Sequence, residues 1–281
     1  MNGPLTFSPR PQFRFMRRPR PASTLKERFE KAIQYFWKVR DAQEQRQGAG
    51  GGKDAGQRAA VTGGGHCRGF ADLFCQLLVE SGIPDAQIYY QRAKPEIGTV
   101  PPNRSRNQKG TELPGYFRAT KDWDLIEVAG SHLVASIELK SQIGPSFGNN
   151  FNNRTEEALG NALDLWEAYR VGAFKPSHRP WLGYFMLLED CEKALTPVRV
   201  SEPHFPVFPE FRDASYAKRY EILCERLVRE RLYNAACFVL SSRDGGRRGK
   251  YREPNPELGV NAFVSSLMGH SIAFAKLRSD A

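Results

Sequence analysis

Three charged residues in the middle of the chain have the types and spacing that phosphodiester hydrolysis needs. Asp124 begins one stretch of alternating apolar and polar residues, and Glu138 and Lys140 end the next. Carboxylate oxygens are ligands that Mg²⁺ prefers, and a bound metal polarises a phosphate and lowers the pKa of a bound water. A neighbouring lysine can orient that water, stabilise the developing charge, or take its proton if the lysine pKa is depressed. The sequence therefore indicates a candidate metal-dependent hydrolytic centre.

A β-hairpin over residues 121–142 must position these three side chains. Side chains alternate between the two faces of a strand, so Glu138 and Lys140 share one face whatever the pairing. The turn is expected at 129–131. On spacing and pattern alone, a solvated strand face with Lys140 as an edge charge is an equal alternative, since acid-x-lysine arises by chance about once in such a chain.

The pairing across the turn decides whether Asp124 joins the other two residues. If Val128 pairs with His132, Asp124 lies opposite Ser136 and diagonal to Glu138. Diagonal neighbours on one face are roughly 7–8 Å apart, within reach of one shared cation. A slip of one residue would move Asp124 to the opposite face. The metal site is therefore conditional on this register.

Composition favours a nucleic-acid partner. The 281 residues are 40% hydrophobic, enough for a sizeable core, and the net charge of +10 with a pI of about 9.5 points to a polyanion. Residues 1–23 hold five arginines and no acid, which is typical of a disordered basic arm. No stretch is long and apolar enough for a membrane span or secretory signal, so we expect a cytoplasmic bacterial protein. The five cysteines lack any CxxC pair, so we expect buried reduced thiols.

The predicted elements give an α/β fold with a mixed central sheet flanked by helices. We expect one nuclease domain over 24–281, with a catalytic core at about 66–241 and a Gly-rich linker or loop at 47–65. Thr24 and Glu27 form a capping box at the first helix. The remaining predictions are helices at 68–80, 214–231 and 261–277, a helix capped by Asn153, strands at 86–91, 181–188 and 235–240, and a long loop at 92–120.

The element order and the set Asp124…Glu138-Leu139-Lys140 resemble the PD-(D/E)xK nuclease fold. Longer segments are similar to the XhoI-type restriction endonucleases over about 29–240: TKDWDLIEV, ASIELKSQIGPSFGNNFNNRTEEALGNALDL and LLEDCEKA…PHFPVFPEFRDASYAKRYEILCERL. Trp123 stands where the PD motif has proline, and residues 1–23 correspond to no part of the family that we can identify.

The resemblance implies a type II enzyme that cuts the palindrome CTCGAG in double-stranded DNA with Mg²⁺, after the first C, leaving 5′ overhangs. It also implies a homodimer, since a two-fold dimer reads a palindrome one half-site per subunit, and a companion DNA methyltransferase. By position, Asp124, Glu138 and the Leu139 carbonyl would be metal ligands, and Lys140 would position the water. A repair or recombination nuclease of the same fold and a non-catalytic DNA-binding module are the alternatives.

Base reading has several candidates. Asn pairs bidentately with adenine and Arg with guanine in the major groove. The candidates follow the catalytic lysine: Asn149, Asn150, Asn152, Asn153 and Arg154. Asn is also an ordinary loop and capping residue. The basic set Arg247, Arg248, Lys250 and Arg252 is expected to touch phosphates or nothing. Glu80 and Glu157 are candidates for a further acid near the metal, although a solvated helix charge is favoured for both. His204 is expected to pack in a Pro/aromatic loop.

Overall fold

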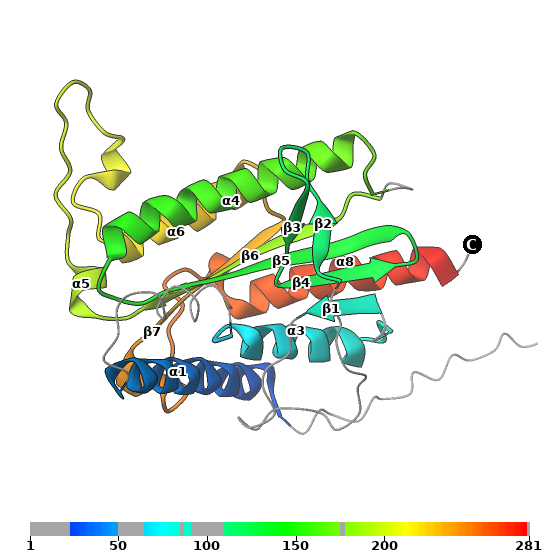
Figure 1. The fold of residues 1–281 in the computed structure, drawn as a ribbon, viewed down its shortest axis with the longest axis horizontal. Helices are drawn as coiled ribbons and strands as arrows, with labels where there is room; N and C mark the ends of the chain where they lie inside the picture. Colours follow the sequence, from blue (N-terminus) through cyan, green and yellow to red (C-terminus); the bar gives the residue numbers. More distant parts are fainter. Residues whose placement is uncertain (1–22, 50–64, 85–86, 91–109, 175–177, 280–281) are drawn as a thin grey trace, which may run out of the picture.

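The computed structural model describes residues 23–49, 65–84, 87–90, 110–174 and 178–279 (Figure 1). Nearly all of the predicted basic arm, most of the Gly-rich segment and most of the predicted loop 92–120 lie outside these residues. Helix α1 extends to Ala49, so the first residues of the predicted linker are helical. Within the described residues, no helix is both long enough and apolar enough to cross a membrane.

A five-stranded mixed sheet forms the centre, in the order β1-β4-β5-β6-β7. The strands β1, β4 and β5 are antiparallel, whereas β5, β6 and β7 are parallel. Their bounds are β1 Ile88–Tyr90, β4 Leu125–Ala129, β5 His132–Gln142, β6 Trp181–Glu189 and β7 Ala235–Ser241. A separate two-stranded sheet pairs β2 Glu112–Pro114 with β3 Thr120–Asp122. Strand β2 lies inside the predicted loop, and β3 lies where the predicted loop meets the predicted hairpin.

Helices cover both faces of the sheet, as predicted (Figure 1). One face carries α1 Leu25–Ala49, α3 Arg68–Glu80 and α8 Val260–Ser279. The other carries α4 Phe147–Arg170 and α6 Tyr216–Arg229. The short helices are α5 Glu192–Leu195, η3 Pro209–Phe211, α7 Arg243–Gly246 and η4 Pro256–Leu258.

Strand β6 shows why the sheet needs two helical layers. Its sequence is almost continuously apolar, as in parallel strands that are buried on both faces. Alternation sends Phe185 toward α1 and α3, where its ring centroid lies 4.6 Å from that of Phe70. Tyr184 and Met186 belong to the cluster under α4 and α6. Both clusters therefore share a single sheet.

The helix ends follow local sequence where caps are present. The backbone N of Thr24 donates to Glu27 Oε2 at 2.7 Å, and the N of Glu27 donates to Thr24 Oγ1 at 3.2 Å, which confirms the predicted capping box. Helix α3 has the predicted bounds, and Gly82 follows it with a φ of 96°, a conformation that favours glycine. The cysteines are free thiols and four of the five are buried, whereas Cys191 is only half-buried.

Helix α4 begins earlier than predicted. Its first residue is Phe147, with Ser146 as the N-cap, so the expected cap at Asn153 is wrong. Phe147 is buried and Phe151 packs on the same apolar cluster. Burial of these rings outweighs the weak helix propensity of the intervening asparagines, which therefore lie in the first two turns of the helix.

The register of the hairpin also differs from the prediction. Ile126 pairs with Ser136, and Val128 pairs with Leu133, with a bulge between Glu127 and Val128. The predicted pairing of Val128 with His132 is therefore wrong. The turn contains two residues, and a two-residue turn with an added bulge residue changes the register along the strands. Ahead of the bulge the change is two residues, which preserves the face of every side chain.

Candidate active site

The hairpin brings the three predicted residues together. Asp124 immediately precedes β4, and its Oδ2 accepts a hydrogen bond from the backbone N of Leu139 at 2.7 Å. Glu138 and Lys140 lie on β5, and the Lys140 ammonium is ion-paired with Glu138 Oε1. Glu138 is fully buried, whereas a fifth of the Lys140 side chain is exposed. Two carboxylates and an ammonium thus converge beside the sheet, on the side that faces α4.

The pKa values of Asp124 and Glu138 are shifted in opposite directions. Burial, followed by the negative charge of Glu138, raises the pKa of Asp124 to about 6. Burial also opposes ionisation of Glu138, but the attraction of Lys140 and Lys121 outweighs it and lowers the pKa of this carboxyl. Glu138 is therefore an anion at neutral pH, and Asp124 ionises close to neutrality.

Lys140 remains positively charged. Burial would lower its pKa, but the charges of Glu138 and Asp124 dominate and raise the pKa above the usual lysine value. Lys140 could accept a proton only if its pKa were depressed, and the two neighbouring carboxylates produce the opposite shift. Orienting water and stabilising negative charge are the roles that its charge supports.

Two residues near Glu138 were not predicted from the sequence. Lys121 of β3 places its Nζ 2.8 Å from Glu138 Oε2, and Asn161 of α4 donates from Nδ2 to Glu138 Oε1 at 3.1 Å. Lys121 was the first residue of the predicted hairpin and had no predicted role. Asn161 had a detectable signal, because Glu157, Asn161 and Asp164 form a polar row on an otherwise apolar helix face.

The helix-borne acids Glu157 and Glu80 have different surroundings. Glu157 Oε2 lies 3.4 Å from the Lys140 ammonium and is also paired with Arg154. Glu80 is paired with Arg28 of α1 at 2.6 Å. Only Glu157 therefore adjoins the candidate site, and it contacts the lysine.

Hard divalent cations suit the donors that are present. Glu138 Oε2 is buried and is ion-paired with the Lys121 ammonium at 2.8 Å, which leaves this oxygen a second lone pair for a cation. Burial first and the negative charge of Glu138 second raise the pKa of Asp124, and a bound cation would offset the repulsion between the two carboxylates. No set of three or more His, Cys, Asp or Glu residues gathers for a metal in the described part of the chain. Asp124 and Glu138 thus fit a cation that completes its coordination with other oxygen donors, such as carbonyls, water and phosphate.

The predicted base-reading residues lie in the first two turns of α4. Asn149, Asn152 and Asn153 are exposed and share one helix face, since residues three and four apart are neighbours. Asn150 and Arg154 are half-buried, and Arg154 is bound to Glu157. The three exposed amides can reach a ligand outside the protein.

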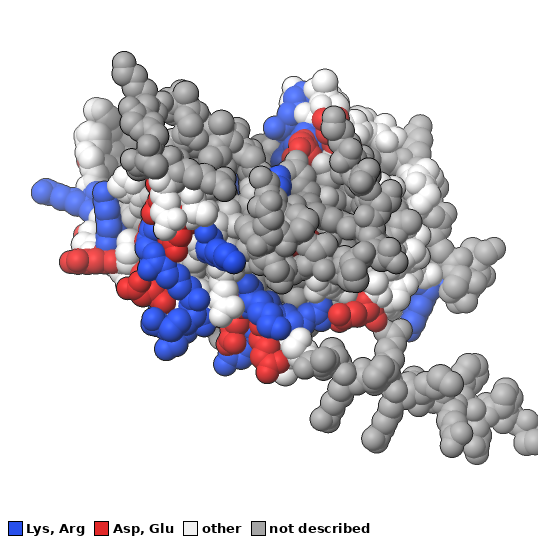
Figure 2. Space-filling view, turned by 60° about the horizontal axis from the view of Figure 1, so that its bottom comes forward, with Lys and Arg blue, Asp and Glu red and all other residues white. Residues whose placement is uncertain are grey.

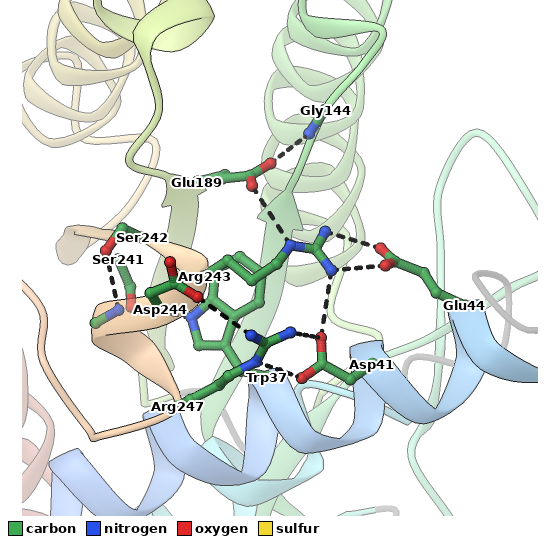
Figure 3. Close-up of polar contacts among 11 residues, drawn as sticks. Trp37, Asp41, Glu44, Gly144, Glu189, Ser241, Ser242, Arg243, Asp244 and Arg247 are labelled. Atoms are coloured by element: carbon green, nitrogen blue, oxygen red, sulfur yellow. Dashed lines mark hydrogen bonds and ion pairs between the residues drawn. The ribbon is translucent and has the colours of Figure 1, made fainter.

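A network of ion pairs joins α1, α7 and the end of β6 (Figure 3). Arg243 binds Glu44 at 2.6 and 2.8 Å, and its Nε is 4.0 Å from Glu189. Glu189 Oε2 accepts from the backbone N of Gly144 at 2.8 Å, just before α4. Arg247 binds Asp41 at 2.8 Å in the same network. These contacts hold the β5–α4 connection in place.

Two of the four residues in the basic set at 247–252 are paired with carboxylates. Arg247 binds Asp41 and Arg252 binds Asp190 at 2.8 Å, so both have partners within the protein, and phosphate contact stays a prediction. Arg248 and Lys250 are exposed. In the face shown in Figure 2, the described basic side chains lie next to acidic ones and form no unbroken band.

The histidines named below lie outside the candidate centre. His66 is buried, with Nε2 2.9 Å from Ser141 Oγ. His132 stacks near His178, with ring centroids 6.0 Å apart, at the turn end of the hairpin. His204 is exposed, so the prediction that it packs in its loop is wrong. The neighbouring Phe205 is 85% exposed, because the segment between α5 and α6 projects from the molecule (Figure 1).

Comparisons with known proteins identify the family of the chain. The family model described as "Restriction endonuclease XhoI" matches residues 45–253. Type II restriction enzyme BstVI of Geobacillus stearothermophilus is 48% identical over 234 residues, covering 82% of this chain and 97% of that protein. Type II restriction enzyme XhoI of Xanthomonas vasicola is 45% identical over 173 residues, covering 62% and 64%. AbrI of Azospirillum brasilense, also a type II restriction enzyme, is 42% identical over 178 residues, covering 62% and 71%.

No solved structure matches the chain. The family model spans most of the chain and includes Asp124, Glu138 and Lys140, and the BstVI similarity extends over nearly the whole of that relative. The chain therefore belongs to the XhoI family of restriction endonucleases and is a site-specific deoxyribonuclease.

Proposed function

We propose that the chain is a Mg²⁺-dependent type II restriction endonuclease that cuts double-stranded DNA at CTCGAG, after the first C, leaving 5′ overhangs. The observation that carries the chemistry is the convergence of Asp124, Glu138 and Lys140 beside one sheet. The similarity to the XhoI restriction enzyme supports the choice of recognition sequence.

Asp124 and Glu138 would hold the cation, with the Leu139 carbonyl as a third protein ligand. When bound, Mg²⁺ supplies a Lewis acid for the scissile phosphate and lowers the pKa of a water. Lys140, held as an ammonium by Glu138, orients that water and stabilises negative charge at the phosphate oxygens. Glu157 limits the movement of Lys140 from the opposite side.

A PD-(D/E)xK fold is part of this proposal. The mixed sheet supports it, since an acid precedes β4, Glu-x-Lys lies on β5, and α4 connects β5 to the parallel strand β6. Trp123 occupies the sequence position at which the motif has proline. Its side chain is buried in the apolar cluster on the α4 side of the sheet. The shared core of α1, α8 and the sheet supports a single domain over 24–281, with the catalytic core within about 66–241.

DNA recognition would use the exposed start of α4. Asn149, Asn152 and Asn153 would contact base edges, since all three are exposed, whereas the half-buried Asn150 and Arg154 would act closer to the site. A homodimer suits a palindrome, because each subunit then reads one half-site. A companion methyltransferase would protect host DNA at the same sequence.

A plasmid digest with mapped ends tests the proposal. With Mg²⁺ we expect discrete bands whose 5′ overhangs map to CTCGAG, and with chelator we expect intact plasmid. Discrete bands at another sequence would retain the enzyme class and reject the specificity. Preferential cutting of flaps, nicks or junctions would instead indicate a repair or recombination nuclease, and site binding without any cutting would indicate a DNA-binding module.

A further inference from the structure

The β2–β3 hairpin is docked on α4 beside the candidate active site (Figure 1). Asp164 Oδ1 accepts hydrogen bonds from the backbone N of Tyr116 and of Phe117, both at 2.7 Å, and its Oδ2 pairs with Arg118 Nε at 2.6 Å. A Cβ at Gly115 would lie 2.5 Å from Asp164 Oδ2, so the close approach requires glycine there. The hairpin tip is therefore anchored by one buried aspartate.

Arg118 continues from this anchor to the active-site acid. Its second terminal nitrogen donates to Asn161 Oδ1 at 2.7 Å, and Asn161 Nδ2 donates to Glu138 Oε1 at 3.1 Å. Arginine can only donate hydrogen bonds, and a carboxylate can only accept them. The Asn161 amide therefore has one satisfactory orientation, with its oxygen toward Arg118 and its NH₂ toward Glu138.

The same hairpin contacts the other oxygen of Glu138. Lys121 of β3 lies 2.8 Å from Glu138 Oε2, and its ammonium also stands 4.5 Å from the centre of the Trp123 ring. The β2–β3 hairpin thus contacts both oxygens of Glu138. Lys121 contacts Oε2 directly, and Arg118 acts on Oε1 through Asn161. The anchor to Asp164 already attaches the tip, so the bond from Arg118 to Asn161 is not needed for docking.

We propose that Asn161 and Arg118 are positioning residues that orient Glu138 for the metal, an inference that rests on the proposed nuclease function. Arg118 sets the orientation of the Asn161 amide, and Asn161 holds Oε1. Oε2, which is ion-paired with the Lys121 ammonium, then keeps a second lone pair that can face the cation. Residues that hydrogen-bond a metal ligand typically change metal affinity or activity by about 10–100-fold when they are replaced.

Metal affinity of the full chain tests this relay without relying on cleavage. We would titrate Mn²⁺ by electron paramagnetic resonance into wild type, Asn161→Ala, Asn161→Asp and Arg118→Ala. Arg170→Ala is the matched control, because it removes an arginine and an ion pair from the exposed surface of the same helix. Melting temperatures would be recorded for every variant.

The expected result is a Mn²⁺ dissociation constant about 10–100-fold higher for both Asn161 variants and for Arg118→Ala, with no change for Arg170→Ala. Asn161→Asp keeps the acceptor for Arg118 and loses the donor to Glu138, so it should bind as weakly as Asn161→Ala. If Asn161→Ala fails to fold, Arg118→Ala decides the matter, since its side chain is 43% exposed.

Wild-type affinity in these variants, or equal weakening in Arg170→Ala, would overturn the relay. If a variant melts at a lower temperature while its Mn²⁺ affinity stays constant, the Arg118–Asn161–Glu138 contacts stabilise the fold and do not position the metal ligand. Neither outcome affects the digest of plasmid by wild type. Failure of that digest, by contrast, would reject the nuclease proposal even if the metal affinities changed as expected.

Discussion

Asp124 Oδ2 accepts a hydrogen bond from the backbone N of Leu139, so the first acid is fixed between the two side chains that flank Leu139 along β5. This contact crosses the hairpin at the residue between Glu138 and Lys140. The hydrogen bond keeps the buried Asp124 carboxyl close to Glu138 despite the repulsion between two negative charges. Both acids are consequently available to one cation.

Lys140→Ala should abolish cleavage while leaving binding of the duplex nearly unchanged. The ammonium stabilises the negative charge that develops during the reaction, and loss of such a group typically lowers the rate about 10²–10³-fold. Single-turnover cleavage and gel-shift binding in chelator measure the two effects. Lys218→Ala, which removes a surface ion pair with Glu221, is the control. Near-normal cleavage by Lys140→Ala would show that its role is misassigned.

Activity should decline as pH falls through about 6, because Asp124 must lose its proton to hold a cation and its pKa is raised to about 6. Raising the Mg²⁺ concentration should shift this decline to lower pH, since metal and proton compete for the carboxylate. A cleavage profile from pH 5 to 8 at two Mg²⁺ concentrations measures it. A profile that is flat through pH 6 contradicts the assignment.

The same raised pKa predicts that Asp124→Asn stabilises the metal-free protein at pH 8. A carboxyl whose folded-state pKa exceeds its ordinary value of 3.8 contributes stability that is present below about pH 4 and lost as pH rises through 6. Asparagine cannot ionise, so the variant should melt roughly 2–6 °C higher at pH 8 in chelator. The difference should shrink toward pH 4.5. A lower melting temperature at pH 8 would oppose this account.

Glu157→Gln should slow cleavage by about 3–30-fold, a modest effect for loss of one charged neighbour. The Glu157 carboxylate lies 3.4 Å from the Lys140 ammonium and limits its position. Glu80→Gln removes a helix acid that pairs with Arg28 and provides the control. Single-turnover rates at saturating Mg²⁺ measure the difference, and equal rates for the two variants would exclude a role for Glu157.

Replacing Asn149, Asn152 or Asn153 by Ala should reduce discrimination between CTCGAG and a site with one changed base pair. A good bidentate contact contributes about 1–3 kcal/mol of discrimination. Competition binding in chelator with both duplexes measures it for each variant. Leu163→Ala changes an exposed side chain farther along α4 and serves as the comparison. If all three variants retain full discrimination, base reading lies elsewhere in the chain.

Local pattern predicted most elements of the fold, since α3, β6 and β7 depend on apolar runs that end at turns and glycine. The face shared by Glu138 and Lys140 followed from alternation alone. The pairing of Val128 did not, because a two-residue turn and a bulge are decided by backbone geometry that the alternation does not encode. The predicted face of Asp124 was still correct, because the register ahead of the bulge differs from the predicted one by two residues.

Contacts between distant segments account for the rest. Lys121 and Asn161 meet Glu138 only when β3 and α4 are assembled on the sheet. The asparagine run resembles a loop, but burial of Phe147 and Phe151 makes it helical. The pairing of Arg247 with Asp41 joins residues that lie near opposite ends of the sequence. Such partners cannot be identified from residue type alone.

Cleavage of a duplex containing one CTCGAG, by wild type and by Glu138→Gln, tests whether Asp124 and Glu138 form a metal centre for site-specific cleavage. We expect wild type with Mg²⁺ to cut each strand between the first C and T, and Glu138→Gln to bind the duplex without cutting it. Cutting by Glu138→Gln at the wild-type rate, or wild-type cutting that persists in chelator, would contradict a metal centre built on Asp124 and Glu138.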